Sequence, residues 1–270
     1  MAPLCFMRTL ERRRAFSLVK MIATDLDDTL FRPDYTISRY TVETLEKVRD
    51  LGIKIVYATA RGKSAEELLP DHLFDGRVLM NGALAYAGDT LLYDRSIPFE
   101  DYAPFLAHLS DQTMSVGAEI KGVHYTNFAV TGSWYDIRHS HLTDFQENHG
   151  PADKLFVLVQ NPAEEDRLKS SLPAHLYISV SRDGLAMVMH REAKKSLGLA
   201  ALVRHFGLVP EEVAAFGDQP NDMDMLEYAG WGIAMANAAE EVRAIADEIG
   251  DSNSQDGVAR WLDRNVLNKA

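Results

Sequence analysis

The sequence predicts an α/β protein, in which a doubly wound parallel sheet forms a core and a second, α+β unit is inserted into that core. Short apolar runs recur along the chain, and each ends in polar or glycine-rich residues, as buried strands do. Segments of helical period lie between these runs. Strands that alternate with helices are typical of a parallel sheet covered by helices on both faces, and this pattern decides the fold class.

The core elements can be assigned in chain order. Buried strands are predicted at residues 21–24, 53–59 and 213–216, where mainly apolar residues follow one another. Amphipathic helices are predicted at residues 38–51 and 199–206, because apolar residues recur there every three or four positions. Each predicted strand end is followed by polar residues, which makes these ends the place to look for a site.

The middle of the chain has a different pattern. Between residues 85 and 189, strand-like pieces are separated by polar loops and helical stretches; they are 155–159, 176–180 and 186–189. Because polar strand ends lie on both sides of this region, it is predicted to be an insertion. We therefore expect a core domain of residues 21–84 and 190–270 and an inserted cap domain of residues 85–189.

The first twenty residues differ from the rest in charge, with five basic side chains against one acidic side chain. A secretory signal would place its charges before an apolar stretch and a cleavage site, and this segment lacks that order. We expect residues 1–20 to be a disordered N-terminal extension, with Met21 as the functional start. A tail that binds a partner is the alternative.

Composition narrows the class of partner. The net charge of -12 opposes binding to nucleic acid backbones and to anionic membrane surfaces. No run of about 18 uncharged apolar residues is present, as a membrane-spanning helix would require. Cys5 is the only cysteine, so an intramolecular disulfide is excluded. We expect a cytoplasmic protein whose partner is neither nucleic acid nor a membrane.

The predicted strand ends carry the residues with chemical potential. Ligands of such sheets collect outside the carboxyl ends of the strands. Three groups of residues follow predicted strands: Asp25-Leu26-Asp27-Asp28-Thr29, Thr59-Ala60-Arg61, and Gly217-Asp218-Gln219-Pro220-Asn221-Asp222. We therefore expect these three groups to meet at one edge of the sheet.

Asp25 and Asp27 stand two residues apart at a buried strand end, where two carboxylates repel each other unless a cation or a proton is present. Mg²⁺ would resolve this conflict, since it prefers hard oxygen ligands, and Asp218 could complete its shell. In phosphoryl transfer a carboxylate can act as the nucleophile, a role that suits Asp25. Asp27 could then protonate the leaving alkoxide and later activate water.

A phosphoryl group would also need donors. The hydroxyl of Thr59 and the backbone amides around Ala60 could hold it, and Lys195 could supply a cation. Each residue alone has a plainer explanation. The acidic pair could cap a helix, and Gly217-Asp218 could simply form a turn. Arg61 could contact the substrate or pair with a surface carboxylate, and both options stay open.

The residues in question fall into four groups: Asp25-Leu26-Asp27-Asp28-Thr29, Thr59, Lys195, and Gly217-Asp218-x-x-Asn221-Asp222. In order and spacing these groups resemble the four motifs of the haloacid dehalogenase (HAD) superfamily. The insertion, together with Asn81-Gly82-Ala83, Met235-Ala236-Asn237-Ala238 and Asp256-Gly257-Val258, resembles the Cof-type subclass IIB phosphatases. The resemblance spans about residues 21–262.

This resemblance implies a Rossmann-like core with an α/β cap, and a Mg²⁺-dependent phosphatase that acts on a small phosphorylated metabolite such as a sugar phosphate. It also implies roles for single residues: Mg²⁺ bound by Asp25, the backbone carbonyl of Asp27, and Asp218; phosphate held by Thr59, Lys195 and Asn221; and these groups oriented by Asp222. Lys195 is preferred over Lys194 because it stands twelve residues before Gly207, as in the family. Lys194 is then expected to face solvent.

Two features depart from the family pattern. Ala60 stands where many relatives have glycine, which narrows the approach to phosphate but leaves the amide available. Residues 187–193 lack the acidic and small residues expected before Lys195.

Two other functions remain open beside phosphate ester hydrolysis. One is a phosphosugar mutase, and the other is a phospho-aspartate switch or metabolite sensor that does not turn over.

Overall fold

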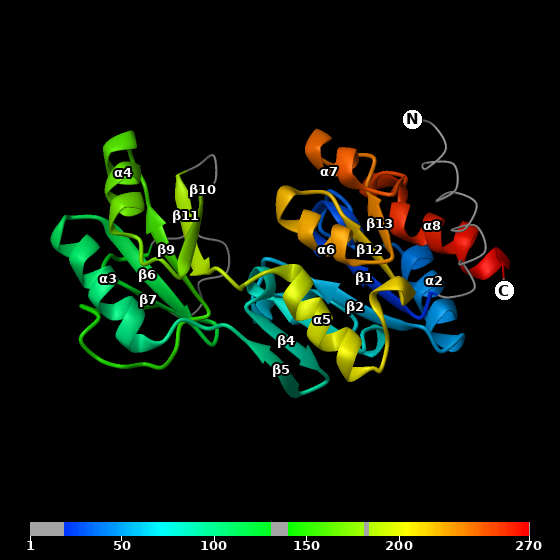
Figure 1. The fold of residues 1–270 in the computed structure, drawn as a ribbon, viewed down its shortest axis with the longest axis horizontal. Helices are drawn as coiled ribbons and strands as arrows, with labels where there is room; N and C mark the ends of the chain where they lie inside the picture. The colour runs from blue at the N-terminus through cyan, green and yellow to red at the C-terminus, as the bar shows by residue number, and fades with distance from the viewer. Residues whose placement is uncertain (1–18, 131–139, 181–183, 270) are drawn as a thin grey trace.

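The computed structural model describes residues 19–130, 140–180 and 184–269. Within these ranges the chain forms two lobes, each built on its own β-sheet (Figure 1). The larger lobe contains both ends of the described chain, and the smaller lobe comes from its middle. This arrangement agrees with an α/β core that carries an inserted unit.

The core sheet has the strand order β14-β13-β12-β1-β2-β3-β4-β5. Its parallel strands are β1 (Met21–Thr24), β2 (Lys54–Ala58), β3 (Gly76–Leu79), β12 (Val213–Gly217), β13 (Trp231–Ala234) and β14 (Glu248–Ile249). The sheet grows outward in both directions from the β1/β12 pair. The strand order therefore reverses at β1, where a doubly wound sheet opens its ligand crevice.

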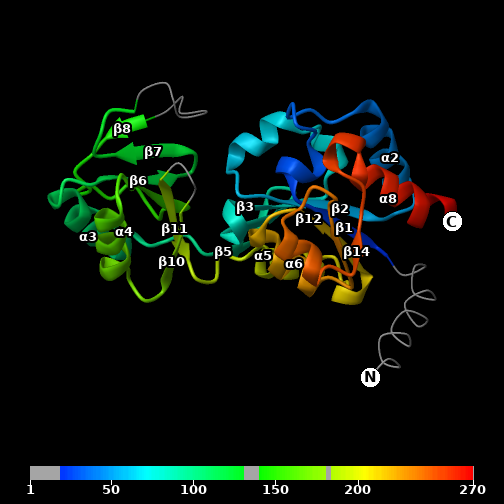
Figure 2. The same cartoon turned by 90° about the horizontal axis from the view of Figure 1, so that it is seen from above.

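Helices cover both faces of the core sheet, as Figure 2 shows. The core helices are α2 (Arg39–Asp50), α5 (Lys195–His205), α6 (Met223–Tyr228), α7 (Glu240–Ile245) and α8 (Gly257–Asn265). Helices α2 and α8 pack together on one face, and α5 and α6 pack together on the other. Every residue of β1 and β12 is buried, which explains why these strands read as continuous apolar runs.

Short helical turns link several of these elements, and some of them carry site residues. They are Leu26–Leu30, Lys63–Leu68, Asp71–Leu73, Met80–Gly82, Pro210–Glu212, Pro220–Asp222, Asn253–Gln255 and Leu267–Lys269. No helix in the described part of the chain has the length and apolarity needed to cross a bilayer.

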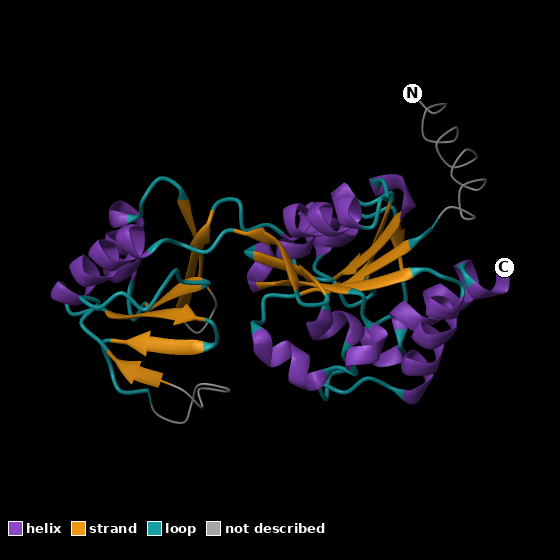
Figure 3. Cartoon of the chain, turned by 90° about the horizontal axis from the view of Figure 1, so that it is seen from below, coloured by secondary structure: helices purple, strands orange, loops and turns teal. Residues whose placement is uncertain are grey.

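The smaller lobe has the strand order β10-β11-β9-β6-β7-β8. Its strands are β6 (Ser115–Ile120), β7 (Val123–Thr126), β8 (Ser140–Leu142), β9 (Lys154–Leu158), β10 (Leu176–Val180) and β11 (Leu185–His190), and its helices are α3 (Phe99–Asp111) and α4 (Pro162–Ser171). Figure 3 shows both helices on the side of this sheet that faces away from the core. The other face of the sheet is turned toward the core.

Side chains of β6 alternate between these two faces. Val116, Ala118 and Ile120 belong to a hydrophobic cluster with α3. Because successive side chains of a strand point to opposite faces, Glu119 lies on the face turned toward the core. There it pairs with Lys154 of β9 (Nζ–Oε2 3.1 Å) and approaches His124 of β7 (Nε2–Oε2 3.4 Å).

The hydrogen bonding at the edge of the core sheet bears on the domain boundary. Strands β4 (Leu84–Ala87) and β5 (Thr90–Asp94) extend the core sheet in antiparallel fashion, whereas the cap is predicted from the sequence to begin at residue 85. We propose instead that the insertion begins after Asp94. The two segments that connect the lobes are joined by hydrogen bonds, since Tyr93 donates to the carbonyl of Glu192 (2.8 Å) and Arg95 to its carboxylate (2.6 Å).

The N-terminal extension expected at residues 1–20 lies outside the described residues, apart from Val19 and Lys20.

Candidate active site

The site begins with Asp25, the residue that follows β1. Its backbone N–H donates to the carbonyl of Phe216 in β12 (2.9 Å), which anchors it at the point where the strand order reverses. Only 6% of Asp25 is exposed. Burial raises the pKa of Asp25 to about 8, although Lys195 acts in the opposite direction. The carboxylate form of Asp25 therefore depends on positive charge nearby.

That positive charge comes from Lys195, the first residue of α5. Its Nζ lies 2.6 Å from Asp25 Oδ1 and 2.6 Å from Asp222 Oδ1, and only 1% of the residue is exposed. Burial acts to lower the pKa of Lys195, but the two carboxylates outweigh it and raise the pKa. Lys194 is exposed, which confirms the expectation that it faces solvent.

Asp222 has no oxygen left unpaired. Its Oδ1 accepts from Lys195, and its Oδ2 accepts from the backbone N–H groups of Asp218 (2.9 Å) and Gln219 (3.0 Å). A side chain at Gly217 would place its Cβ 2.4 Å from the Asp222 Cβ, so glycine is required there. Asp222 thus holds Lys195 and the loop of Asp218 in place.

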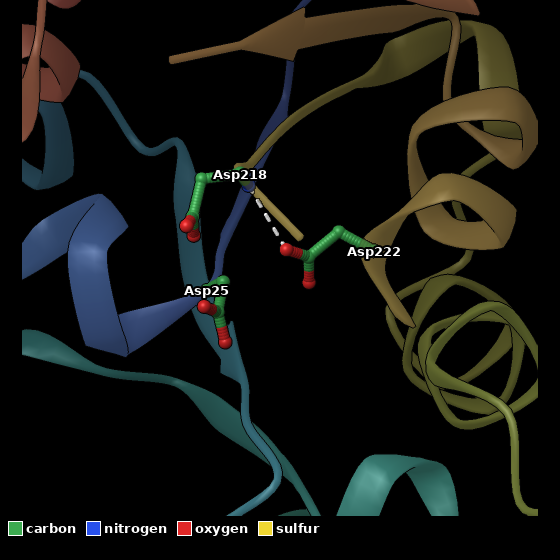
Figure 4. A group of neighbouring side chains, drawn as sticks. All are labelled: Asp25, Asp218 and Asp222. Carbon is green, nitrogen blue, oxygen red and sulfur yellow. Dashed lines mark hydrogen bonds between the residues drawn. The ribbon is translucent and has the colours of Figure 1, made fainter. Parts of the chain in front are cut away.

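Asp218 follows β12 and points toward Asp25, as Figure 4 shows. Its Oδ1 accepts from Thr29 Oγ1 (2.7 Å), and its Oδ2 accepts from Gln219 Nε2 (3.0 Å). Burial raises the pKa of Asp218 to about 6. Sequence reasoning gave Thr29 no role, because a threonine after an acidic pair also fits an ordinary helical turn.

The donor set fits a hard divalent cation. Asp25, Asp218 and Asp222 each offer a carboxylate oxygen, and these oxygens lie within 4.8 Å of one another (Figure 4). Asp222 is already saturated by Lys195 and two amides, whereas no described residue donates a hydrogen bond to Asp25 Oδ2. Asp25 and Asp218 are therefore better placed than Asp222 to bind a cation directly.

Asp27 pairs with Arg61 and not with Lys195. Its two carboxylate oxygens accept from Arg61, with Nε–Oδ2 at 2.7 Å and Nη2–Oδ1 at 2.6 Å. Of the two options left open for Arg61, the structure shows pairing with a carboxylate, namely that of Asp27 itself. The sequence could not identify this partner, because the two residues are separated by 34 positions.

Thr59 lies in the loop after β2 and is fully buried. Its backbone N–H donates to Val78 of β3 (2.9 Å), and its carbonyl accepts from Asn81 (3.0 Å). Its hydroxyl accepts from the backbone N–H of Arg61 (3.1 Å), and Ala60 between them is half-buried. The hydroxyl of Thr59 can still donate its own proton to a ligand.

Asn221 is exposed at the rim of the site, and its Nδ2 donates to Asn81 Oδ1 (2.8 Å). Asn81 has a left-handed backbone (φ 52°), which asparagine tolerates better than most residues. The next residue, Gly82, packs so closely on the backbone of Lys194 that a Cβ would lie 2.1 Å from it. The Asn-Gly pair thus supports both Asn221 and the start of α5, a role missed by sequence reasoning.

Two more asparagines support the turn that follows β1. Asn237 Nδ2 donates to the carbonyl of Asp28 (2.8 Å), and its Oδ1 accepts from the backbone N–H of Asn253 (3.0 Å). Asn253 in turn donates to the carbonyl of Phe31 (3.0 Å). These contacts give a structural reason for the Met235-Ala236-Asn237-Ala238 motif, whereas Asn253 had no signal in the sequence.

Comparisons with known proteins agree with this geometry. The model of the haloacid dehalogenase-like hydrolase family matches residues 22–262. The chain is 28% identical to 5-amino-6-(5-phospho-D-ribitylamino)uracil phosphatase YitU of Bacillus subtilis, over 90% of this chain and 96% of that protein. Among solved structures, it is similar to the HAD subclass IIB sugar phosphatase BT4131, with 28% identity, a TM-score of 0.77, and coverage of 91% of this chain and 98% of the other. The phosphatase BT1666 of Bacteroides thetaiotaomicron gives a TM-score of 0.78 at 26% identity, over 92% and 95% of the two chains.

The doubly wound core, the cap and the acidic site at the switch point define a phosphatase that acts on a phosphorylated substrate. The chain belongs to the haloacid dehalogenase-like hydrolase family. The family and the fold class predicted from the sequence are thereby confirmed.

Proposed function

We propose that this enzyme is a Mg²⁺-dependent phosphatase that hydrolyses a small phosphorylated metabolite, a sugar or polyol phosphate, through a phosphorylated Asp25. The observation that carries the proposal is the convergence of Asp25, Asp218 and Lys195, all buried, at the edge where the strand order reverses. This arrangement supplies a nucleophile, a second carboxylate for a cation, and a fixed positive charge within one small volume. In-line phosphoryl transfer requires all three.

Mg²⁺ would be held by the carboxylates of Asp25 and Asp218 and by the backbone carbonyl of Asp27, and when bound it would neutralise charge on the phosphoryl oxygens. The phosphoryl group would be held by Thr59, the backbone amide of Ala60, Lys195 and Asn221; Lys195 lies 2.6 Å from Asp25, which supports its part in this set. Asp222 would act through Lys195 and the loop of Asp218, which it already fixes.

The reaction takes place in two balanced steps. In the first, Asp25 attacks phosphorus, the ester P–O bond breaks, and protonated Asp27 gives its proton to the departing alcohol oxygen. In the second, water attacks phosphorus and gives its proton to the Asp27 carboxylate, while the bond between Asp25 and phosphorus breaks. One water is consumed, inorganic phosphate is released, and both aspartates return to their starting forms.

The similar proteins support the substrate class. YitU is described as a phosphatase of a phosphoribitylamino-uracil, and BT4131 as a sugar phosphatase. Both descriptions name phosphate attached to a hydroxylated carbon chain. The acidic chain, with a net charge of -12, argues against a nucleic acid or an anionic membrane as partner.

The direct test is phosphate release from p-nitrophenyl phosphate, with Mg²⁺ and after its removal by EDTA. Asp25→Asn should reduce the rate to background, because the amide cannot act as the nucleophile. Asp50→Asn, at an exposed position at the end of α2, is the matched control and should keep the wild-type rate. Retained activity of Asp25→Asn, or full activity in EDTA, would contradict the proposal. Isomerised sugar phosphate without free phosphate would instead identify a mutase.

A further inference from the structure

We propose that Met189, in the inserted lobe, is a positioning residue for the phosphate site: its thioether sulfur sets the orientation of the Asn81 amide and, through Asn81, that of Asn221. In the proposed function, on which this inference rests, Asn221 helps to hold the phosphoryl group. Met189 extends that site from the core into the inserted lobe, without itself touching the substrate.

Met189 lies near the end of β11, where the inserted lobe meets the core. Ala186 and Val188 of the same strand belong to the hydrophobic cluster of the inserted lobe, whereas Met189 belongs to that of the core. Tyr177 of β10, the partner of Met189 across the strand pair, packs against the same core cluster. Only 1% of Met189 is exposed, so its side chain is held firmly against the core.

Two donors reach the sulfur of Met189. Asn81 Nδ2 lies 3.7 Å from Sδ, and Tyr177 Oη lies 3.6 Å from it. The hydroxyl of Tyr177 has a single proton and also reaches the carbonyl of Ala193 (3.3 Å), which is a stronger acceptor than a thioether. The sulfur is therefore left for Asn81, and among the residues that the structure describes it is the only acceptor for Asn81 Nδ2.

The chemistry of the sulfur decides how the two amides lie. A thioether accepts hydrogen bonds but has no proton to donate, whereas an amide offers N–H groups on one side and an oxygen on the other. Asn81 must therefore turn Nδ2 toward Met189 and Oδ1 toward Asn221. Asn221 must in turn present its Nδ2 to that oxygen, and this distance is 2.8 Å. The second N–H of Asn221 Nδ2 stays available for a phosphoryl oxygen.

The main chain of Asn81 does not make this choice. Its N–H donates to the carbonyl of Thr59 (3.0 Å) and its φ is 52°, and a half-turn of the side-chain amide leaves both unchanged. Without the sulfur, both orientations of the Asn81 amide become accessible. In the second orientation Asn81 offers a donor to Asn221, which then has to turn its oxygen toward Asn81 and its Nδ2 away.

The experiment measures the dissociation constant of inorganic phosphate by phosphorus NMR titration with Mg²⁺ present. Leucine nearly matches methionine in volume but has no acceptor, so Met189→Leu removes the hydrogen bond and keeps the packing. The dissociation constant should rise by about 2- to 10-fold, as expected for the loss of one neutral hydrogen bond. Met114→Leu is the matched control, because Met114 is 2% exposed but lies in the cluster of the inserted lobe; it should leave the constant unchanged.

The same titration in an Asn221→Ala background separates positioning from a general structural effect. Met189→Leu should cause no further loss there, because Met189 acts on phosphate only through Asn221. A structural disturbance would weaken binding equally in both backgrounds. That result, or a wild-type dissociation constant for the single variant Met189→Leu, would overturn the positioning role.

Failure of the proposed function has a different signature, namely no Asp25-dependent phosphate release by the wild-type enzyme. The orientation of Asn81 can then still be tested by NMR in wild type with labelled methionine methyl groups. We expect the side-chain NH₂ protons of Asn81 to show stronger nuclear Overhauser contacts with the methyl group of Met189 than with the side chain of Asn221. The reverse order would refute the inference whatever the activity.

Discussion

Replacement of Lys195 by methionine tests the electrostatic core of the site. Methionine is similar in length and fills most of the same volume, so the change removes mainly the charge. Asp25 and Asp222 would then lose their shared partner while 6% and 0% exposed, respectively. Removal of one partner from a buried ion pair costs about 3–5 kcal/mol, because the remaining charge is left without compensation.

The measurement is urea unfolding in EDTA at pH 7, followed by tryptophan fluorescence. Trp231 and Trp261 are both buried in the core and report on it. With a typical dependence of the unfolding free energy on urea concentration, the predicted loss of stability lowers the urea midpoint of the core transition by roughly 1–2 M. Mg²⁺ should recover part of the loss, because a bound cation restores positive charge beside Asp25.

Lys194 offers a matched control, since it is the same residue type one position earlier but is exposed. Lys194→Met should change the free energy of unfolding by less than about 0.5 kcal/mol. If the two variants are equally stable, Lys195 does not compensate buried charge, and the electrostatic account of the site is refuted.

Three further predictions concern the cap and the loops. Burial acts to raise the pKa of Glu119, but His124 and Lys154 outweigh it and lower the pKa to about 2, so its stabilisation is present above its unfolded value of 4.5 and is lost as pH falls toward 2. The stability advantage of wild type over Glu119→Gln, measured as the difference in their free energies of unfolding, should therefore fall by about 3 kcal/mol between pH 6 and pH 2. Urea titrations of both proteins at each pH measure this difference. A difference that does not change with pH would contradict the prediction. Asn237→Ala should lower the free energy of unfolding by about 1–2 kcal/mol, because the turn after β1 loses the hydrogen bonds of Asn237. It should also lower kcat at temperatures where the variant remains folded. An unchanged kcat would show that activity does not depend on these hydrogen bonds. Gly82→Ala should unfold the core or lower its melting temperature strongly, because a Cβ would lie 2.1 Å from the Lys194 backbone, and a melting temperature within a degree or two of wild type would refute that contact.

Much of the core could be predicted because its strands are buried on both faces. The runs at β1 and β12 have no alternation that could be confused with a half-exposed strand, and their predicted bounds differ from the observed ones by at most one residue. Strands β4 and β5 were assigned to the cap instead. They form an antiparallel edge whose outer strand is half-exposed, so their apolar pattern is weak.

The residues of the site also divide into those that could be predicted from the sequence and those that could not. Residues directly after buried strands, such as Asp25 and Asp218, could be identified because topology alone brings strand ends together. Thr29, Asn81 and Asn253 could not, because their roles depend on partners 140 to 222 positions away. Polar residues in loops also have many local reasons to occur, so their type alone does not reveal a distant partner.

The tie between the two segments that connect the lobes has a consequence for modularity. Because Tyr93 and Arg95 both bond to Glu192, the chain leaves the core and returns to it at nearly the same place. The whole insertion between Arg95 and Glu192 therefore joins the core in the same way as one long surface loop would. A shorter loop or a different cap could replace it without moving Asp25, Asp218 or Lys195, which are all held by contacts within the core. The inserted lobe can thus change in size or structure while the positions of the three core residues stay fixed.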